Sequence, residues 1–234
     1  MRLLGLFILS TLLLQTNEIK AQNRLSDVTL FGSFTTSSKL FYHPHDSDEY
    51  LRSQFFLLNN IISVGVDFRR TLEYTGIQLG LSIEYIKKTE HFSHPISASK
   101  IIPIKEGYTV VPIEASGYFF IPFGYEKWKI YMGGGGGVYI GSREYEYANV
   151  EAPTVHRKLG FGIHVVSGIQ FNLSSLFTLR SELKFRDIHF ETTNQFTQPT
   201  TGYNGSTIYL NQLPFDSRIN INGMTLTMGI LFPL

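Results

Sequence analysis

The sequence predicts an all-β protein, an eight-stranded antiparallel up-and-down barrel that crosses a membrane. Three observations support this fold class. Apolar and polar residues alternate through long segments, the joins between these segments alternate between short and long, and an apolar leader begins the chain. Successive side chains of a strand point to opposite faces, so each alternating segment has one apolar face and one polar face. Most segments exceed the roughly 9–11 residues that a tilted strand needs to cross a bilayer.

The first element, residues 1–22, is predicted to be a secretory signal peptide. After Met1-Arg2 an apolar run extends from Leu3 to Leu14, and the polar stretch QTNEIKAQ follows it. A short positive start, an apolar run of about 7–15 residues and a cleavage region are typical of an export signal. The run is too short for a membrane-spanning helix, which needs about 20 apolar residues. Residues 23–234 are therefore the predicted mature barrel domain.

The composition excludes several classes of function. The formal net charge of +1 offers no electrostatic basis for binding nucleic acid, so no nucleic-acid partner is predicted. The chain has no cysteine, which excludes disulfides and cysteine metal sites.

The alternation predicts eight strands, and the connections between them are alternately long and short. The predicted strands are Val28–Thr36, Phe55–Arg69, Tyr74–Lys87, Tyr108–Phe123, Trp128–Arg143, Lys158–Phe171, Phe177–His189 and Ile219–Phe232. Three joins are short, and four are long and polar. The long ones are Thr35–Gln54, Lys87–Gly107, Arg143–Lys158 and Glu191–Arg218. Because long and short joins alternate, all four long loops should lie at one end of the barrel, as short periplasmic turns and long extracellular loops do in membrane barrels.

The segment FTLRSELKFR, residues 177–186, decides which face of the barrel meets lipid. Its apolar residues share one parity, and its four charged residues share the other. A charged side chain facing lipid near the midplane costs about 2–4 kcal/mol, against a total stability of roughly 5–15 kcal/mol. In a membrane the charged face must therefore point into the barrel. The predicted lipid face includes Leu79, Leu81, Ile83, Phe161, Ile163, Val165, Leu179, Leu183 and Phe185.

With the segment NINGMTLTMGILF near the C-terminus, this pattern resembles the small outer-membrane barrels of Gram-negative bacteria, of the outer membrane protein A and X type. The resemblance covers nearly all of the mature chain. It implies a porin-like barrel of the cell envelope, located in the cell outer membrane, in contact with its lipids and inserted by the barrel assembly machinery. We expect a monomer with both termini in the periplasm. The chain departs from the family in placing Pro233 and Leu234 after its last aromatic residue, Phe232.

The polar faces are expected to form an ionic cluster inside the barrel. Its predicted members are Glu84, Glu114, His164, Arg180, Glu182, Lys184 and Arg186. An eight-stranded interior is just wide enough to be filled by side chains, and opposite charges placed there neutralise each other. The expected role is structural: the cluster fixes the strand register and blocks flow. No catalytic, cofactor-binding or metal-binding residue is predicted, and no cofactor.

Two motifs invite other interpretations. The glycine run at Met132–Gly141 lacks the Gly-Lys-Ser/Thr of a phosphate-binding loop, so we interpret it as a strand that bends or packs closely. The loop histidines His43, His45, His91 and His94 suit zinc or similar ions in type, but we expect them to be solvated.

The predicted function is structural or surface-binding, with a possible extracellular ligand held by the long loops, where scaffolded binding sites usually lie. Three alternatives remain open. One is a narrow channel through the ionic interior. Another is a hydrolase that modifies lipid A through His164 with Ser167 or Ser181. The last is a secreted soluble β-barrel with its apolar residues inside.

Overall fold

The computed structural model describes residues 25–73, 75–97, 100–122, 127–174, 176–203 and 206–234, so the predicted signal peptide lies outside the described residues. The strands are β1 (Ser26–Phe41), β2 (Phe55–Thr71), β3 (Ile77–Ser97), β4 (Lys100–Ile121), β5 (Trp128–Tyr147), β6 (Val150–Glu151), β7 (Thr154–Asn172), β8 (Thr178–Asn194), β9 (Thr200–Tyr203), β10 (Ser206–Tyr209), β11 (Phe215–Asn220) and β12 (Met224–Pro233). One short helix, α2 (Glu49–Ser53), lies between β1 and β2. Among the described residues, no helix is long and apolar enough to cross a membrane.

The strands close into one antiparallel barrel. β1 pairs with β2, and the pairing continues in chain order through β3, β4, β5, β7 and β8. β11 and β12 together fill the eighth position, because each pairs with β8 on one side and β1 on the other. The predicted eight-stranded up-and-down barrel is confirmed. The predicted last strand, Ile219–Phe232, is interrupted at residues 221–223.

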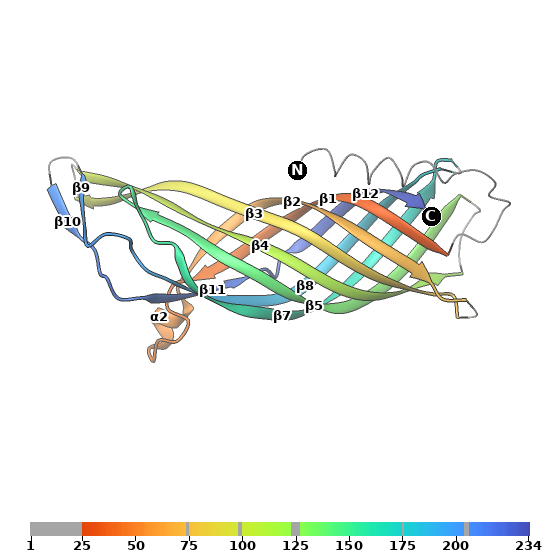
Figure 1. The fold of residues 1–234 in the computed structure, drawn as a ribbon, viewed down its shortest axis with the longest axis horizontal. Coiled ribbons are helices and arrows are strands. Elements are labelled where there is room, and N and C mark those ends of the chain that lie inside the picture. The colour runs from red at the N-terminus through yellow and green to blue at the C-terminus, as the bar shows by residue number, and fades with distance from the viewer. Residues whose placement is uncertain (1–24, 74, 98–99, 123–126, 175, 204–205) are drawn as a thin grey trace, which may run out of the picture.

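The long joins lie at one end of the barrel, as predicted. Figure 1 shows α2, β9 and β10 at this end, here called the loop end, and the C-terminus at the opposite end, called the turn end. The extent of the loops was predicted wrongly. The segment Lys87–Gly107 is mostly strand, since β3 and β4 run to within a few residues of each other. Outside a bilayer a strand needs no apolar face, so its backbone pairing can continue where the hydrophobic alternation ends.

The side chains point as the membrane prediction requires. Along β8, buried residues alternate with exposed or half-buried ones, and Arg180, Glu182, Lys184 and Arg186 are all buried. Eight of the nine predicted lipid-facing residues are exposed, and Leu183 is half-buried. The result is a barrel with charge inside and an apolar belt outside. A soluble barrel requires the reverse arrangement, so the secreted soluble alternative is wrong.

The barrel wall divides beyond the belt, at the loop end. The pairing of β2 with β3 stops at Ser63 and Ile86, and that of β5 with β7 stops at Tyr139 and Gly160. Asn60, just past the end of the first pairing, has a φ of 55°, a left-handed conformation that asparagine tolerates better than most residues. β3, β4 and β5 therefore continue as a three-stranded sheet, which we call the loop-end extension (residues 87–97, 100–109 and 142–147).

Candidate functional site

The inward face of β8 shows how the barrel interior is layered. From the turn end toward the loop end its inward side chains are Arg180, Glu182, Lys184 and Arg186, followed by Ile188 and Phe190. Two ionic clusters therefore occupy the membrane-spanning part of the interior. An apolar layer separates them from the loop end.

The lower ionic cluster lies nearer the turn end and consists of Asp27, Asp67, Arg69, Arg180 and Glu182. The guanidinium of Arg180 lies 2.7 Å from the carboxylate of Asp67 and 2.9 Å from that of Asp27. Arg69 donates to Asp67 at 2.6 Å and also to Glu182. The hydroxyl of Tyr131 donates to Glu182 as well. Each buried charge thus has an opposite charge in contact, the condition under which burial of ions is tolerated.

The upper ionic cluster consists of Glu84, Glu114, Lys184 and Arg186. Lys184 contacts Glu114 at 2.8 Å, and Nε of Arg186 lies 3.0 Å from Oε1 of the same carboxylate. Arg186 also pairs with Glu84. Hydroxyls complete the coordination of both carboxylates: Ser63 donates to Glu84 at 2.5 Å, and Tyr139 donates to Glu114 at 2.7 Å.

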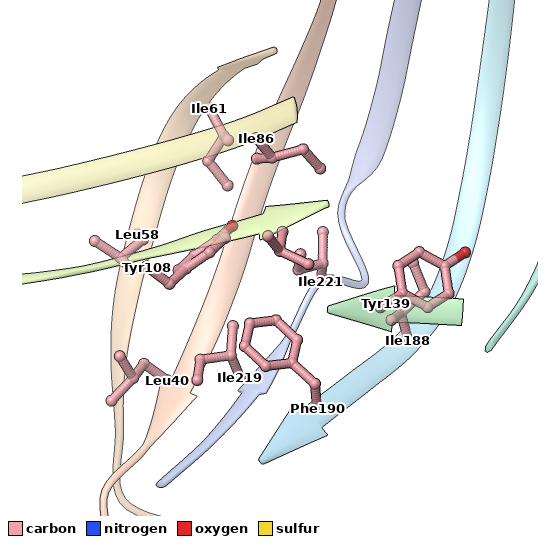
Figure 2. Close-up of a cluster of buried hydrophobic side chains, with 11 residues drawn as sticks. Leu40, Leu58, Ile61, Ile86, Tyr108, Tyr139, Ile188, Phe190, Ile219 and Ile221 are labelled. Atoms are coloured by element: carbon pink, nitrogen blue, oxygen red, sulfur yellow. The ribbon is translucent and has the colours of Figure 1, made fainter. Parts of the chain in front are cut away.

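An apolar layer covers the upper ionic cluster on its loop-end side. Figure 2 shows its side chains converging from opposite parts of the wall. The members are Leu40, Leu58, Ile61, Ile86, Tyr108, Val110, Tyr139, Ile188, Phe190, Ile219 and Ile221. They come from β1, β2, β3, β4, β5, β8 and β11 and from the break before β12. None is more than 1% exposed, so these side chains are buried against one another.

Another buried ion pair lies beyond the apolar layer, between Glu106 of β4 and Arg143 of β5. The pair is bidentate, with nitrogen–oxygen distances of 2.7 and 2.6 Å, and Arg143 also donates to Ser217 of β11 at 3.2 Å. The ring of Tyr145 lies 4.4 Å and that of Phe215 lies 5.5 Å from the guanidinium carbon. Bidentate pairing and aromatic contact are the geometry for which arginine is suited.

All seven residues predicted for the ionic cluster are buried and face the interior. Six of them, Glu84, Glu114, Arg180, Glu182, Lys184 and Arg186, belong to the two clusters, and His164 lies beside the upper one. Asp27, Asp67 and Arg69 were missed. The signal was available in β2, where Ser63, Gly65, Asp67 and Arg69 alternate with apolar residues. Glu106 and Arg143 were missed because they fell inside or at the edge of predicted loops.

His164 contacts a serine that the sequence did not point to. Its Nε2 lies 2.8 Å from Oγ of Ser116, and its Nδ1 lies 3.9 Å from Glu114. The serines considered from the sequence, Ser167 and Ser181, share the parity of the lipid-facing residues, away from His164. A serine, a histidine and a carboxylate in this order are the residue types of a nucleophilic triad. Ser116 is 9% exposed and His164 3%, so the arrangement is enclosed among lumen side chains.

A network on the outer wall surrounds Glu191, beyond the apolar belt at the loop end. Its carboxylate accepts hydrogen bonds from Lys158 at 2.9 Å and from Arg218 at 2.8 Å, and His45 lies 3.2 Å away. Burial raises the pKa of the Glu191 carboxyl, but the two cations outweigh burial and lower it to about 2. The network joins β7, β8 and β11 to the loop that precedes α2.

The histidines of the long joins are dispersed in the structure. His45 contacts Glu191, whereas His91 and His94 are exposed on β3. Within the described ranges, no group of three or more histidine, aspartate or glutamate side chains is arranged to hold a metal ion.

Comparison with known proteins identifies the fold. No protein-family model and no curated protein match the chain. Among solved structures, the outer membrane protein OprG from Pseudomonas aeruginosa is 8% identical, with a TM-score of 0.55, and the match covers 89% of this chain and 95% of that one. Neisserial surface protein A is 11% identical, with a TM-score of 0.48 and coverage of 89% and 97%. The attachment invasion locus protein of Yersinia pestis is 11% identical, with a TM-score of 0.40 and the same coverage.

At these identities the likeness concerns the fold, and OprG, whose TM-score exceeds 0.5, is the comparison that supports it. The closed ring of eight strand positions, the apolar belt and the charged interior agree with that fold. The chain therefore has the fold of the small eight-stranded outer-membrane β-barrels.

Proposed function

We propose that this protein is a closed barrel of the bacterial outer membrane with a structural or surface-binding role, and that its interior side chains plug the lumen. The single observation that carries the proposal is the apolar layer. Its eleven side chains lie between the ionic clusters and the loop end, and each is at most 1% exposed. An ion passing this level would have to shed its water among groups that offer it little coordination.

The ionic clusters support the same proposal. Arg69 and Glu182 bridge β2 and β8 across the barrel, and Arg186 and Glu84 bridge β8 and β3. Side chains that neutralise each other across the lumen leave no row of free charges for a permeating ion. In this role the clusters fix the strand register, because a slip of one residue would exchange charged and apolar faces.

The surface-binding role is supported by the loop-end extension. β3 and β4 are 21 and 22 residues long, well beyond the roughly 9–11 needed to cross the bilayer. Ile102 and Ile104 of the extension form an apolar cluster with Ala148, which follows it directly, and Tyr203 of β9 and Ile208 of β10 pack against this cluster. Paired strands and packed hairpins hold a surface more rigidly than free loops do, which favours binding of a partner outside the cell. We infer insertion by the barrel assembly machinery and a monomeric state.

A hydrolase is a second candidate because Ser116 and His164 share a hydrogen bond and Glu114 lies 3.9 Å from the other ring nitrogen of His164. Two features oppose it. An ester would have to reach a serine enclosed in the lumen, and the carboxylate of Glu114 is already occupied by Lys184 and Tyr139. The hydrolase predicts an altered lipid A mass on expression in a suitable host, abolished by His164→Ala. We expect no change in lipid A mass.

Single-channel recording in planar bilayers tests the closed barrel. We expect no stable conductance steps from the folded wild-type protein. Glu182→Gln and Arg180→Gln should also stay closed, because the apolar layer remains intact in both. A heat-dependent gel shift verifies that each variant is folded before recording. Reproducible conductance steps from wild type, with an amplitude that changes in Arg180→Gln, would contradict the closed barrel and show that the protein is a channel.

A further inference from the structure

A cavity of about 280 Å³ lies inside the barrel mouth at the turn end, away from the loop end that the proposed function concerns. Its lining includes the terminal residues of five strands, Ser26, Thr71, Asn172, Thr178 and Pro233. The lower ionic cluster forms its floor, because Asp27 belongs to both. The volume is close to the lower end of the usual range for small-ligand pockets, about 300–1,000 Å³.

One side of the cavity carries a row of hydrogen-bond donors. Lys129 of β5 is the cross-strand partner of Gln170 of β7, and Gln170 is also the cross-strand partner of Arg180 of β8. Directly opposed residues share a face of the sheet, with Cβ atoms about 4.5–5.5 Å apart. Lys129 is exposed, whereas Gln170 is 6% and Arg180 2% exposed. The row therefore runs from the mouth of the barrel to the floor of the cavity.

Two donors of this row have no partner within the protein. Nε2 of Gln170 and Nε of Arg180 are both buried, and neither forms a hydrogen bond with any residue that the structure describes. Buried polar groups are hydrogen-bonded in the large majority of cases, because an unmade bond is costly. The row is thus placed to bind an acceptor. The positive charges of Lys129 at the mouth and Arg180 at the floor favour an anionic one.

The cavity also offers an acceptor, on β3, which β4 and β5 separate from β7 in the ring. The amide nitrogen of Gln78 donates to the carboxylate of Asp27 at 2.8 Å. This bond fixes the orientation of the amide, since a carboxylate accepts only from its nitrogen. The amide oxygen, Oε1, is buried without a partner among the described residues. A ligand that reaches it must donate a hydrogen bond.

The charges around the cavity select among small ligands. A dianion such as phosphate would be repelled by the carboxylate of Asp27, and a simple cation would be repelled by Lys129 and Arg180. A carboxylate carries a single negative charge. When an N–H group lies beside it, the ligand satisfies both the donor row and the oxygen of Gln78.

We propose that this cavity binds the free C-terminal end of a peptide. The terminal carboxylate accepts hydrogen bonds from Lys129 and Gln170, and the N–H of the last residue donates to Oε1 of Gln78. Capture of a C-terminal carboxylate is a recurring mode of peptide recognition. Two sources share this chemistry, proteins that end in an L-residue and cell-wall stem peptides that end in a D-residue. The site goes beyond the proposed function and does not depend on whether the barrel conducts.

Isothermal titration calorimetry of the folded protein in detergent tests the proposal. The probe is N-acetyl-alanyl-alanine, in its L,L and D,D forms, and the tighter form identifies the source. We expect the C-terminal amide of the tighter form to bind wild type about tenfold more weakly, as loss of a hydrogen bond to a charged group predicts. N-acetyl-alanyl-proline of the same handedness lacks the last N–H and should bind about fivefold more weakly, as loss of a neutral hydrogen bond predicts.

Variants of the donor row provide a second test. Gln170→Leu should weaken binding of the acid by about tenfold, and Lys129→Gln should weaken it by about fivefold without changing the affinity for the amide. Arg70→Gln is the matched control for charge, because Arg70 is an exposed cation on the outer face of β2 near the same end of the barrel. Its binding should equal that of wild type.

The gel shift first verifies that each variant is folded. The proposal is overturned if wild type binds neither form of the acid, or binds acid and amide equally, because the cavity would then hold only water or an unselected solute. These two comparisons use wild type alone, so they stand even where a variant fails to fold. Equal weakening in Arg70→Gln and Lys129→Gln would also overturn it, because general charge attraction would then explain the binding.

Discussion

Arg186 shows why the stability of the barrel depends on keeping every partner of the interior ion pairs. Its guanidinium contacts both Glu84 and Glu114, and its side chain is 1% exposed. Removing one partner of a buried pair is costly because the other charge stays buried and unpaired.

We therefore expect Arg186→Met to destabilise the barrel by roughly 3–5 kcal/mol. The matched control is Lys158→Met, because Lys158 pairs with Glu191 on the surface and is 58% exposed. A surface pair contributes far less, because water screens the two charges. Urea unfolding in lipid vesicles, followed by the gel shift, measures both changes. Equal losses in the two variants would mean that the interior network contributes no more than a surface pair.

Glu191 predicts a dependence of stability on pH. Its pKa is lowered to about 2 in the folded protein from an ordinary value of 4.5. A lowered carboxyl pKa contributes stability that is fully present above the unfolded pKa and is lost as the pH falls through the folded one.

Wild type should therefore exceed Glu191→Gln in unfolding free energy by up to about 1 kcal/mol at neutral pH. The difference should shrink as the pH falls below 4.5 and vanish only below pH 2, where the carboxyl is protonated in the folded protein as well. Urea midpoints of both proteins across this range provide the measurement. A difference that stays constant down to pH 2 would show that the carboxylate charge is not the source.

At the scale of the element, β5 shows what a run of glycines does in a strand. A Cβ added at Gly135 would lie 1.9 Å from the backbone oxygen of Ala115 on β4, a contact that only backbone movement could relieve. A Cβ added at Gly117 on β4 would meet nothing within 4 Å. The run therefore permits close approach of β4 and β5, and the interpretation as a phosphate-binding loop is excluded by its position inside a strand.

These two glycines form a matched pair for substitution. Gly135→Ala should destabilise the barrel by about 1–3 kcal/mol, as overpacking does. Gly117→Ala should be neutral or stabilise by about 0.4–1 kcal/mol, because it restricts the unfolded chain without creating a clash. The urea midpoints of both variants, compared with that of wild type, measure these changes. A larger loss for Gly117→Ala than for Gly135→Ala would contradict the close packing of these strands.

The alternation of side chains allowed the strands and the lipid face to be predicted, because a membrane-spanning strand must keep its apolar residues on one side. The same alternation in β2 could have placed Asp67 and Arg69 in the barrel interior, because both have the parity of the inward-facing residues. Contacts that depend on register could not be predicted. Ser116 meets His164 only because β4, β5 and β7 pair in one particular register, and sequence alternation does not specify how neighbouring strands align. The lengths of β3 and β4 were underestimated because their polar ends carry no hydrophobic signal.

At the scale of the whole molecule, two arrangements support the proposed function. The ring of eight strand positions leaves no free edge within the apolar belt, as a bilayer demands. Inside it, the ionic clusters and the apolar layer follow one another along the axis. Beyond the belt the wall divides, and the loop-end extension continues outward. Under the proposed function, the membrane part acts as an anchor and the loop end carries the surface that binds a partner.

The central claim is that apolar side chains meet lipid while their polar neighbours face a filled interior. A nitroxide scan of β12 tests it most directly, because the chain has no native cysteine and each introduced label is unique. In lipid vesicles, labels at Leu226 and Met228 should collide frequently with dissolved oxygen, which concentrates in the acyl chains. Labels at Thr225 and Thr227 should be shielded from it. High oxygen accessibility at the two threonines, with shielding at Leu226 and Met228, would contradict the claim.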